Sequence, residues 1–508
     1  MVEFPGFDQV PKTSRANLVY CCCISSLMLI LITIWACPES LAPPTRPVAV
    51  VEVELADGIS PDAQLHEPVG ILANQQQLTK PAAQRLVKPA VAADSAAASA
   101  CAGRRIYMYE LPTEFNLALL ELCASKLVGW INFCAHVQNY GFGESVNSSE
   151  PLFVDDWYGT DAYMLEVIFH SRMLRYECLT DSPSDADAFF IPFYAGIHAL
   201  PYLYTDKRME WQGPELVAWL QENATDSWQR HGGRDHFLIA GRTAWDFSRS
   251  LEDDTGHWGT TLLVLPELAN VTVFSLERRP WLSMDQAVPY PTGFHPSTAT
   301  SLRRWTHEVR TSSREYLFAF SGALRPSMAT SIRGLLYNQC INAKTRCSLL
   351  DCSKIKCSHN PIPIYKKLLH AEFCLQPRGD TATRRSVFDS IIAGCIPVFF
   401  HEDTAYTQYS WHLPKDPTTY SVFMSETGIK NGSILVEEVL GSYSQTRIKE
   451  MREELVRLIP GSLYRHPEST DPKLIDPEFC DAFDLSVKGM LNKVLSFKAH
   501  PHSSQLAS

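Results

Sequence analysis

The stretch of sequence that decides the fold runs from Phe373 to Phe400 and reads FCLQPRGDTATRRSVFDSIIAGCIPVFF. Its pattern predicts a buried strand that ends at Pro377, a glycine-containing loop, a helix over residues 383–393 and a second buried strand. Gly394 stands where a glycine commonly ends a helix. Such a unit aims unpaired backbone N–H groups and the positive helix end at the loop, where an anion such as a diphosphate can bind.

Charged and polar side chains gather at this loop. Arg384 and Arg385 stand at the start of the helix, and Asp389 lies on the same helix face as Ser386, where a carboxylate can accept hydrogen bonds from a ribose diol. Arg325 follows the apolar run 315–322, so it can face the same crevice and bind phosphate through two hydrogen bonds. A buried βαβ unit with surface arginines explains the spacing equally well. The predicted donor-binding residues are Arg325, Arg378, Gly379, Thr383, Ser386 and Asp389.

Short apolar runs recur along the chain between helical stretches, of which residues 162–176 form the first. This alternation predicts an α/β fold with parallel sheets covered by helices on both faces. The loop 289–296 is expected to separate two such domains, and a helix over residues 481–497 to end the chain. The predicted strands are residues 105–111, 188–194, 236–241, 261–265, 315–322, 373–377 and 395–400.

Catalytic candidates follow from one rule, that open parallel sheets bind ligands beyond the carboxyl ends of their strands. Asp246 follows the strand 236–241, so it is the predicted general base, and His198, after the strand ending near Tyr194, is the second candidate. Trp245 and Phe247 beside Asp246 equally suggest a packing role, and a lone histidine is more often structural. Asp235 and His236 precede their strand and are predicted to be structural.

Metal and nucleic-acid chemistry find little support. Asp185 and Asp187 form a D-x-D pair, but the pair precedes a strand, whereas the carboxylates of a metal-dependent sugar transferase must follow one. No metal ligands are therefore predicted. The sequence lacks the HExxH, GxSxG and P-loop signatures. With 508 residues, 45 Lys+Arg and 56 Asp+Glu, the net charge of −11 argues against a nucleic-acid binder.

The amino-terminal region predicts a membrane anchor and an oxidising compartment. Residues 18–37 are apolar and uncharged, long enough to span a bilayer, and Lys12 and Arg15 orient the amino terminus towards the cytosol. A cleaved signal peptide is the alternative. Eleven cysteines beyond the anchor predict disulfides, with at least one bridge inside the group Cys340 to Cys357 and at least one unpaired thiol. Glycosylation sequons begin at Asn147, Asn223, Asn270 and Asn431.

In this order, these motifs resemble the exostosin-like glycosyltransferases, and in their extended form the plant xyloglucan galactosyltransferase branch. The resemblance covers about residues 105–495, and its long block is more specific than its short motifs. The matching stretches are IYMYELP at 106–112, SDADAFFIPFY at 184–194, GRDHFLIAGRTAWDF at 233–247, VPYPTGFHP at 288–296, the arginine after FSG, and DTATRRSVFDSIIAGCIPVFFHEDTAYTQYSWHLP at 380–414.

The resemblance implies a GT-B fold, in which two Rossmann-like domains face each other across a cleft, in a type II Golgi membrane protein. It implies inverting, metal-independent transfer from a UDP-sugar, commonly UDP-galactose, onto xylosyl side chains of xyloglucan, with no cofactor beyond the donor. Relatives in this branch use other donors, including UDP-galacturonic acid. Asp389 stands where other branches often carry the longer Glu, so its ribose contact is less secure.

The expected organisation has seven parts. They are a cytosolic tail (1–17), a transmembrane anchor (18–37), a flexible stem (38–103), an acceptor-side Rossmann-like domain (104–295), a UDP-sugar-binding Rossmann-like domain (296–460), a helical segment (461–498) and a tail (499–508). Two other readings stay open: a non-catalytic Golgi glycan-binding subunit of a transferase complex, and a metal-dependent transferase that uses Asp185 and Asp187. Candidate partners are the UDP-sugar donor, the polysaccharide acceptor, the Golgi membrane and other glycosyltransferases.

Overall fold

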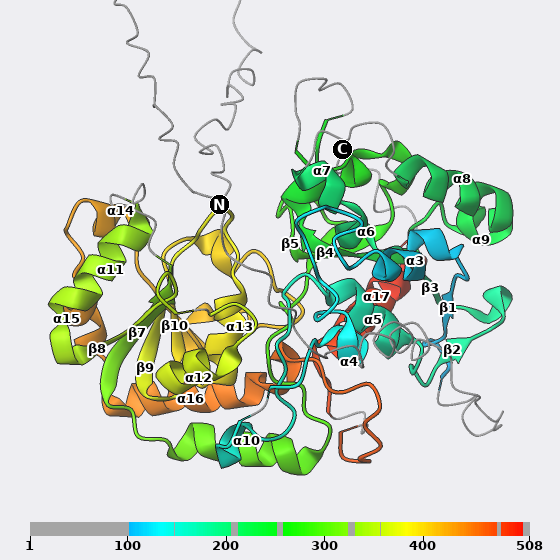
Figure 1. Cartoon of the computed structure of the whole chain (residues 1–508). Coiled ribbons are helices and arrows are strands. Elements are labelled where there is room, and N and C mark those ends of the chain that lie inside the picture. The colour runs from blue at the N-terminus through cyan, green and yellow to red at the C-terminus, as the bar shows by residue number, and fades with distance from the viewer. Residues whose placement is uncertain are drawn as a thin grey trace, which may run out of the picture. The chain divides into compact units, whose positions relative to one another are not determined.

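Two parallel β-sheets form the framework of the described part of the chain (Figure 1). The computed structural model describes residues 101–146, 148–204, 212–250, 258–323, 331–355, 357–474 and 479–500. The predicted anchor, most of the stem, Asn147 and Arg325 lie outside these residues. Among the described residues, no helix is long and apolar enough to cross a membrane.

The N-terminal sheet has the strand order β2-β1-β3-β4-β5-β6, and all its pairings are parallel. Its strands are β1 (Ile106–Met108), β2 (Leu179–Thr180), β3 (Ala188–Ile191), β4 (His236–Thr243), β5 (Thr272–Glu277) and β6 (Asp285–Ala287). The C-terminal sheet has the order β11-β10-β9-β7-β8 and is also wholly parallel. Its strands are β7 (Tyr316–Gly322), β8 (Cys347–Asp351), β9 (Ala371–Gln376), β10 (Ile396–Phe399) and β11 (Val422–Phe423).

Helices connect these strands, as the predicted α/β alternation requires. Those around the N-terminal sheet are α3 (Leu117–Glu121), α4 (Gln138–Gly141), α5 (Leu165–Met173), α6 (Ala195–His198), α7 (Leu200–Tyr204), α8 (Gly213–Asn223) and α9 (Thr225–Arg230). Those that follow are α10 (Ala299–Thr311), α11 (Ile332–Asn342), α12 (Pro361–Leu369), α13 (Arg385–Ile392), α14 (Glu426–Lys430), α15 (Val436–Gly441), α16 (Gln445–Leu458) and α17 (Ala482–Ala499).

Both faces of each sheet are buried, because successive residues of a strand enter different apolar clusters. In β3, Phe189 belongs to one cluster and Phe190 to another, and all four residues of the strand are buried. In β7, Phe318 and Ala319 divide in the same way. Such two-sided burial produces the near-continuous apolar strands of parallel sheets. The predicted fold class, parallel α/β, is therefore confirmed.

One predicted strand is wrong. Residues 261–265 do not pair with a sheet: Leu262–Val264 is a single 3₁₀ turn, which is followed by Pro266. The strand that joins the sheet is β5, whose first residue Thr272 and last residue Glu277 are polar. The run 261–265 packs as a loop against the apolar cluster below the sheet. It therefore has the apolar composition of a buried strand although its backbone does not pair with one.

The C-terminal helix α17 returns to the N-terminal sheet. Asp481 caps α17 and pairs with the buried Arg172 of α5, which also contacts Asp484 at 3.2 Å. Near the other end, the Lys493 ammonium donates to Thr272 Oγ1 at 3.0 Å and to the Ser283 carbonyl at 2.9 Å. The predicted helix at 481–497 is thus present, and it ties the end of the chain to the first sheet.

Five disulfides connect the described cysteines. They are Cys101–Cys178, Cys123–Cys134, Cys340–Cys347, Cys352–Cys357 and Cys374–Cys395. The group Cys340 to Cys357 contains two of them, which confirms the prediction of at least one bridge there. Cys480 belongs to none of the five.

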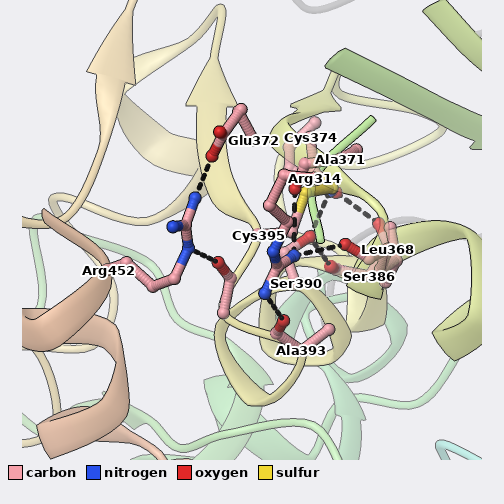
Figure 2. The surroundings of a disulfide bond; sticks show 12 residues. Arg314, Leu368, Ala371, Glu372, Cys374, Ser386, Ser390, Ala393, Cys395 and Arg452 are labelled. Atoms are coloured by element: carbon pink, nitrogen blue, oxygen red, sulfur yellow. Dashed lines mark hydrogen bonds and ion pairs between the residues drawn. A yellow bond between two sulfur atoms is a disulfide. The ribbon is translucent and has the colours of Figure 1, made fainter. Parts of the chain in front are cut away.

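Arg314 organises the backbone around the Cys374–Cys395 bridge (Figure 2). Its guanidinium donates to four carbonyl oxygens, those of Val309, Leu368, Ala371 and Ala393, at 2.8–3.1 Å. These carbonyls come from α10, α12, β9 and the end of α13. A single cation therefore satisfies acceptors from four elements of the C-terminal domain.

Replacing Arg314 with Met keeps an unbranched apolar stem but removes the guanidinium that donates to these four carbonyl oxygens. Since hydrogen bonds to a charged group are worth about 1.5–3 kcal/mol each and some of these acceptors keep other donors, we expect the free energy of unfolding to fall by roughly 3–5 kcal/mol. Chemical denaturation measures it. Arg310→Met is the matched control: this α10 side chain is 45% exposed and pairs with Glu453, so its loss should change stability by under about 1 kcal/mol. Equal stability of the two variants would contradict the role of Arg314.

Candidate functional site

The start of α13 contacts the carboxyl end of β5, which brings the two sheets together at the loop singled out by the sequence. The backbone N–H and the hydroxyl of Thr383 both donate to Glu277 Oε2 at 2.8 Å. The Tyr290 hydroxyl lies 2.9 Å from Thr383 Oγ1. The sequence predicted Thr383 as a site residue. The sequence analysis missed Glu277, because it predicted a strand at 261–265 in place of β5, which ends at Glu277.

Arg384 directly follows Thr383 and is a cation with unused hydrogen-bond donors. Its Nε and Nη2 atoms are buried and have no hydrogen-bond partner among the described residues. Burial lowers the pKa of the guanidinium from its usual value, while Tyr290 and Asp380 oppose that shift. A buried cation without hydrogen bonds is costly, and an anionic ligand would remove the cost.

Gly379 makes room for this side chain. A Cβ atom at Gly379 would lie 0.6 Å from Arg384 Nη2, so any other residue there would displace the guanidinium. By their position in the first turn of α13, the N–H groups of Arg385 and Ser386 have no intrahelical acceptor. Loop, guanidinium and helix start thus lie together at the place where the sequence predicts an anion site, and anion binding there stays a prediction.

The other predicted donor residues are less favourably placed. Arg378 is 47% exposed and pairs with Glu426 of α14 at 3.2 Å. The Ser386 hydroxyl donates to Gln376 Oε1 at 2.5 Å. Asp389 is buried and accepts a hydrogen bond from the Tyr365 hydroxyl at 3.0 Å, and burial raises its pKa. Ser386 and Asp389 thus bond within the C-terminal domain, and their donor-binding roles stay predictions.

On the N-terminal side, Asp246 is buried in a hydrogen-bonded cluster after β4. Its Oδ2 accepts from Arg242 Nε at 2.7 Å, and its Oδ1 from Trp258 Nε1 at 2.9 Å. The Arg242 guanidinium lies 4.0 Å from the centre of the Tyr163 ring. Tyr163 in turn interacts electrostatically with Arg384, so the cluster reaches towards the start of α13.

His198 ends the short helix α6. Its Nδ1 is buried without a hydrogen-bond partner among the described residues, and its ring packs beside Phe193 and Tyr202. Burial lowers the pKa of His198 to about 4, so the ring is neutral at pH 7. The base assignments of Asp246 and His198 remain predictions.

Glu166 was not singled out by the sequence, because a glutamate in a stretch that reads as amphipathic is expected to face solvent, whereas all nine residues of α5 are buried. Its carboxylate accepts backbone N–H groups of Gly196, Ile197 and Gly241 at 2.5, 3.3 and 2.8 Å. Burial raises the pKa of Glu166 to about 7. It joins the end of β4 to the start of α6, and therefore positions both catalytic candidates.

The residues before the strands have structural partners, as predicted. Asp235 pairs with Arg230 at 2.8 Å and with His236 Nδ1 at 2.8 Å, and His236 Nε2 lies 2.8 Å from the Tyr109 hydroxyl. Asp187 accepts the backbone N–H of Arg105 at 2.9 Å. The D-x-D pair thus lies at the amino edge of the N-terminal sheet, opposite to the carboxyl ends that face α13.

Comparison with known protein families identifies a match that includes these site residues. The model of the Exostosin GT47 domain matches residues 100–439. The chain belongs to the Exostosin GT47 family. Membership shows that it is a glycosyltransferase, as the sequence motifs indicate.

Relatives from Arabidopsis thaliana align over most of this GT47 chain. "Probable xyloglucan galactosyltransferase GT13" is 42% identical over 409 residues, which cover 78% of this chain and 85% of the relative. "Xyloglucan galactosyltransferase MUR3" is 43% identical and covers 78% of this chain and 63% of its own. "Xyloglucan galactosyltransferase XLT2" is 38% identical, with coverages of 77% and 75%.

The described sequons of this GT47 chain are open to modification. Asn223, at the end of α8, and Asn270 and Asn431, in loops, are all exposed. Asn147 lies outside the described residues. Glycosylation of the four asparagines stays a prediction.

Because Arg384 has unpaired donors at the loop, Arg384→Ala should weaken UDP binding by about 10–150-fold, the worth of hydrogen bonds to a charged group. Arg378→Ala should weaken it less, since Arg378 is half-exposed and already paired. Isothermal titration calorimetry compares the two variants. Arg303→Ala, on the exposed side of α10, is the control. The melting temperature of Arg384→Ala should stay the same or rise. Unchanged UDP affinity in this variant would contradict the proposed phosphate site.

Proposed function

We propose that the chain is an inverting glycosyltransferase that moves galactose from UDP-galactose onto xylosyl side chains of xyloglucan. The observation that carries this proposal is the 42% identity over 409 residues to a probable xyloglucan galactosyltransferase. Arg384 at the start of α13 supports it, because its Nε and Nη2 are buried without a hydrogen-bond partner among the described residues, and such donors suit the diphosphate of a sugar nucleotide. The two parallel sheets are of the kind that the GT-B arrangement requires.

The diphosphate gathers negative charge as the sugar leaves, and the enzyme must stabilise that charge. In our proposal Arg384 and the first N–H groups of α13 do so, with Arg378 and Arg325 as further cations. Glu277 cannot share this task, since a carboxylate repels phosphate. It instead fixes Thr383, and with it the orientation of the loop.

The donor site needs no metal ion in this proposal. The backbone contact of Asp187 ties the D-x-D pair to the amino edge of the N-terminal sheet, far along the strands from α13. A metal-dependent transferase would require carboxylates at the opposite edge. Golgi residence and a type II anchor at residues 18–37 belong to the same proposal, and rest on the uncharged apolar run.

The acceptor hydroxyl must lose its proton as it attacks the anomeric carbon from the face opposite to UDP. We assign this proton to Asp246, which follows β4 on the acceptor side, with His198 as the second candidate. The carboxylate has lone pairs beyond those that bind Arg242 and Trp258, so it can still accept a hydrogen bond from a hydroxyl.

The purified full-length chain should transfer one hexose from UDP-galactose to xylosylated xyloglucan oligosaccharides. Mass spectrometry of the products, with a panel of UDP-sugars that includes UDP-galacturonic acid and UDP-glucose, identifies the donor. Preference for another sugar would correct the donor alone. A chain that binds the oligosaccharides but neither transfers nor hydrolyses any UDP-sugar would instead be a glycan-binding subunit.

Asp246→Asn keeps the shape of the side chain but cannot take a proton. In the same assay it should lower turnover by roughly 10²–10⁴-fold while UDP affinity stays unchanged. Asp185→Asn, an exposed carboxylate of the D-x-D pair, is the control and should retain activity. Full activity of Asp246→Asn would transfer the assignment to His198. Unfolding of the variant would show that Asp246 only holds its loop.

A further inference from the structure

Three side chains with metal-ligating atoms meet at a place that the proposed reaction does not use. His136 and Asp161 come from segments around α4 and α5, and His359 precedes α12. One ligand atom from each lies within 4.8 Å of the other two. His136 and His359 also line a pocket of about 430 Å³, together with Glu144.

The contacts inside this cluster are close but incomplete. His359 Nε2 lies 2.7 Å from Asp161 Oδ2, and the rings of His136 and His359 lie 3.9 Å apart. Asp161 Oδ1 accepts the backbone N–H of Tyr163, which fixes the orientation of the carboxylate. The His136 ring hydrogen-bonds the Gly159 backbone, and its buried Nδ1 is left without a hydrogen-bond partner among the described residues.

Both histidines lie close in sequence to disulfides. His136 follows Cys134 of the Cys123–Cys134 bridge by two residues, and His359 follows Cys357 of the Cys352–Cys357 bridge by two. His359 adopts φ +58°, a left-handed conformation that non-glycine residues rarely take. Such conformations persist where the surroundings require them, often at ligand sites.

The backbone also approaches closely at this point. A Cβ atom at Gly159 would lie 2.9 Å from the His359 carbonyl oxygen, so only glycine allows the segment before Asp161 to come this near. The neighbouring disulfides and the glycine contact help to place the three ligands together without an ion, which lowers the cost of binding.

We propose that His136, Asp161 and His359 bind one divalent transition-metal ion of the Zn²⁺ type. Imidazole nitrogens and carboxylate oxygens bind Zn²⁺ at about 2.0–2.2 Å, so tetrahedral ligand atoms lie about 3.4 Å apart. The His359–Asp161 pair needs to open by less than about 1 Å to reach that spacing. Glu144 or a water molecule would complete the coordination.

The ion would join segments that belong to different sheets. Asp161 is adjacent to Thr160, whose carbonyl accepts a hydrogen bond from Arg385 Nη1 at 2.5 Å. Arg385 begins α13. A metal that fixes Asp161 therefore also fixes the residue that supports the start of the donor-site helix. His136, Asp161 and His359 are not among the proposed donor-binding residues, so the proposal holds whether or not transfer needs a metal.

The test uses the full-length chain, purified in detergent, stripped with EDTA and returned to chelator-free buffer. Titration with Zn²⁺ should show one equivalent bound and a raised melting temperature, and Co²⁺ should give the visible bands of tetrahedral coordination. His136→Gln and His359→Gln should each weaken Zn²⁺ binding by about 100-fold, the share of one ligand in such a site. His307→Gln, an exposed histidine of α10, is the matched control.

The proposal fails if the wild-type chain binds no stoichiometric Zn²⁺, or if both variants bind it as tightly as the control. The cluster would then be a hydrogen-bonded contact only. Should a variant fail to fold, the wild-type comparison of stoichiometry and melting temperature with and without Zn²⁺ still decides. None of these readouts depends on sugar transfer.

Discussion

The pair of hydrogen bonds from Thr383 to the Glu277 carboxylate is the contact on which the candidate site depends. It ties the last residue of β5 to the residue before the cap of α13, so the carboxyl edges of both sheets meet at one loop. Because Glu277 satisfies the Thr383 N–H, the remaining donors at this helix start are those of Arg384 and of the first turn. The Glu277 carboxylate orients Thr383, while Nε and Nη2 of Arg384 are buried without a hydrogen-bond partner among the described residues, which is why we propose an anion site here.

This arrangement distributes roles between the domains. In the proposed reaction, the C-terminal sheet supplies the cation and the helix start, while the N-terminal sheet supplies the acceptor-side groups after β4. Glu166 and Arg242 hold those groups in place through contacts with backbone and carboxylate. The proposed metal would strengthen the same junction from the other side of Thr160, where Arg385 already donates. The proposed diphosphate site and the contacts that support it thus both involve the start of α13.

The sequence was sufficient to predict the fold class because parallel strands that are buried on both faces have uninterrupted apolar sequences, as in β3 and β10. The strand–loop–helix unit at Phe373–Phe400 was recognised because its glycine, arginines and Gly394 are local signals. Strand β5 was missed because its ends are polar, whereas the apolar run at 261–265 packs as a loop. Periodicity cannot separate those cases.

The candidate site was predicted less completely than the fold. The roles of Glu277 and Glu166 depend on contacts between segments more than 70 residues apart in sequence. The role of Arg384 depends on the loss of solvent around its side chain. No local sequence pattern encodes either property. The metal cluster is a further case, since His136 and His359 lie over 200 residues apart and meet only through folding.

A crystal structure of the chain with bound UDP tests the central claim most directly. The account predicts that the diphosphate lies within hydrogen-bond distance, about 2.7–3.2 Å, of the Arg384 guanidinium and of the first N–H groups of α13. Glu277 should still hold Thr383. A diphosphate bound elsewhere, with Arg384 turned away from it and its donors satisfied by protein, would contradict the account.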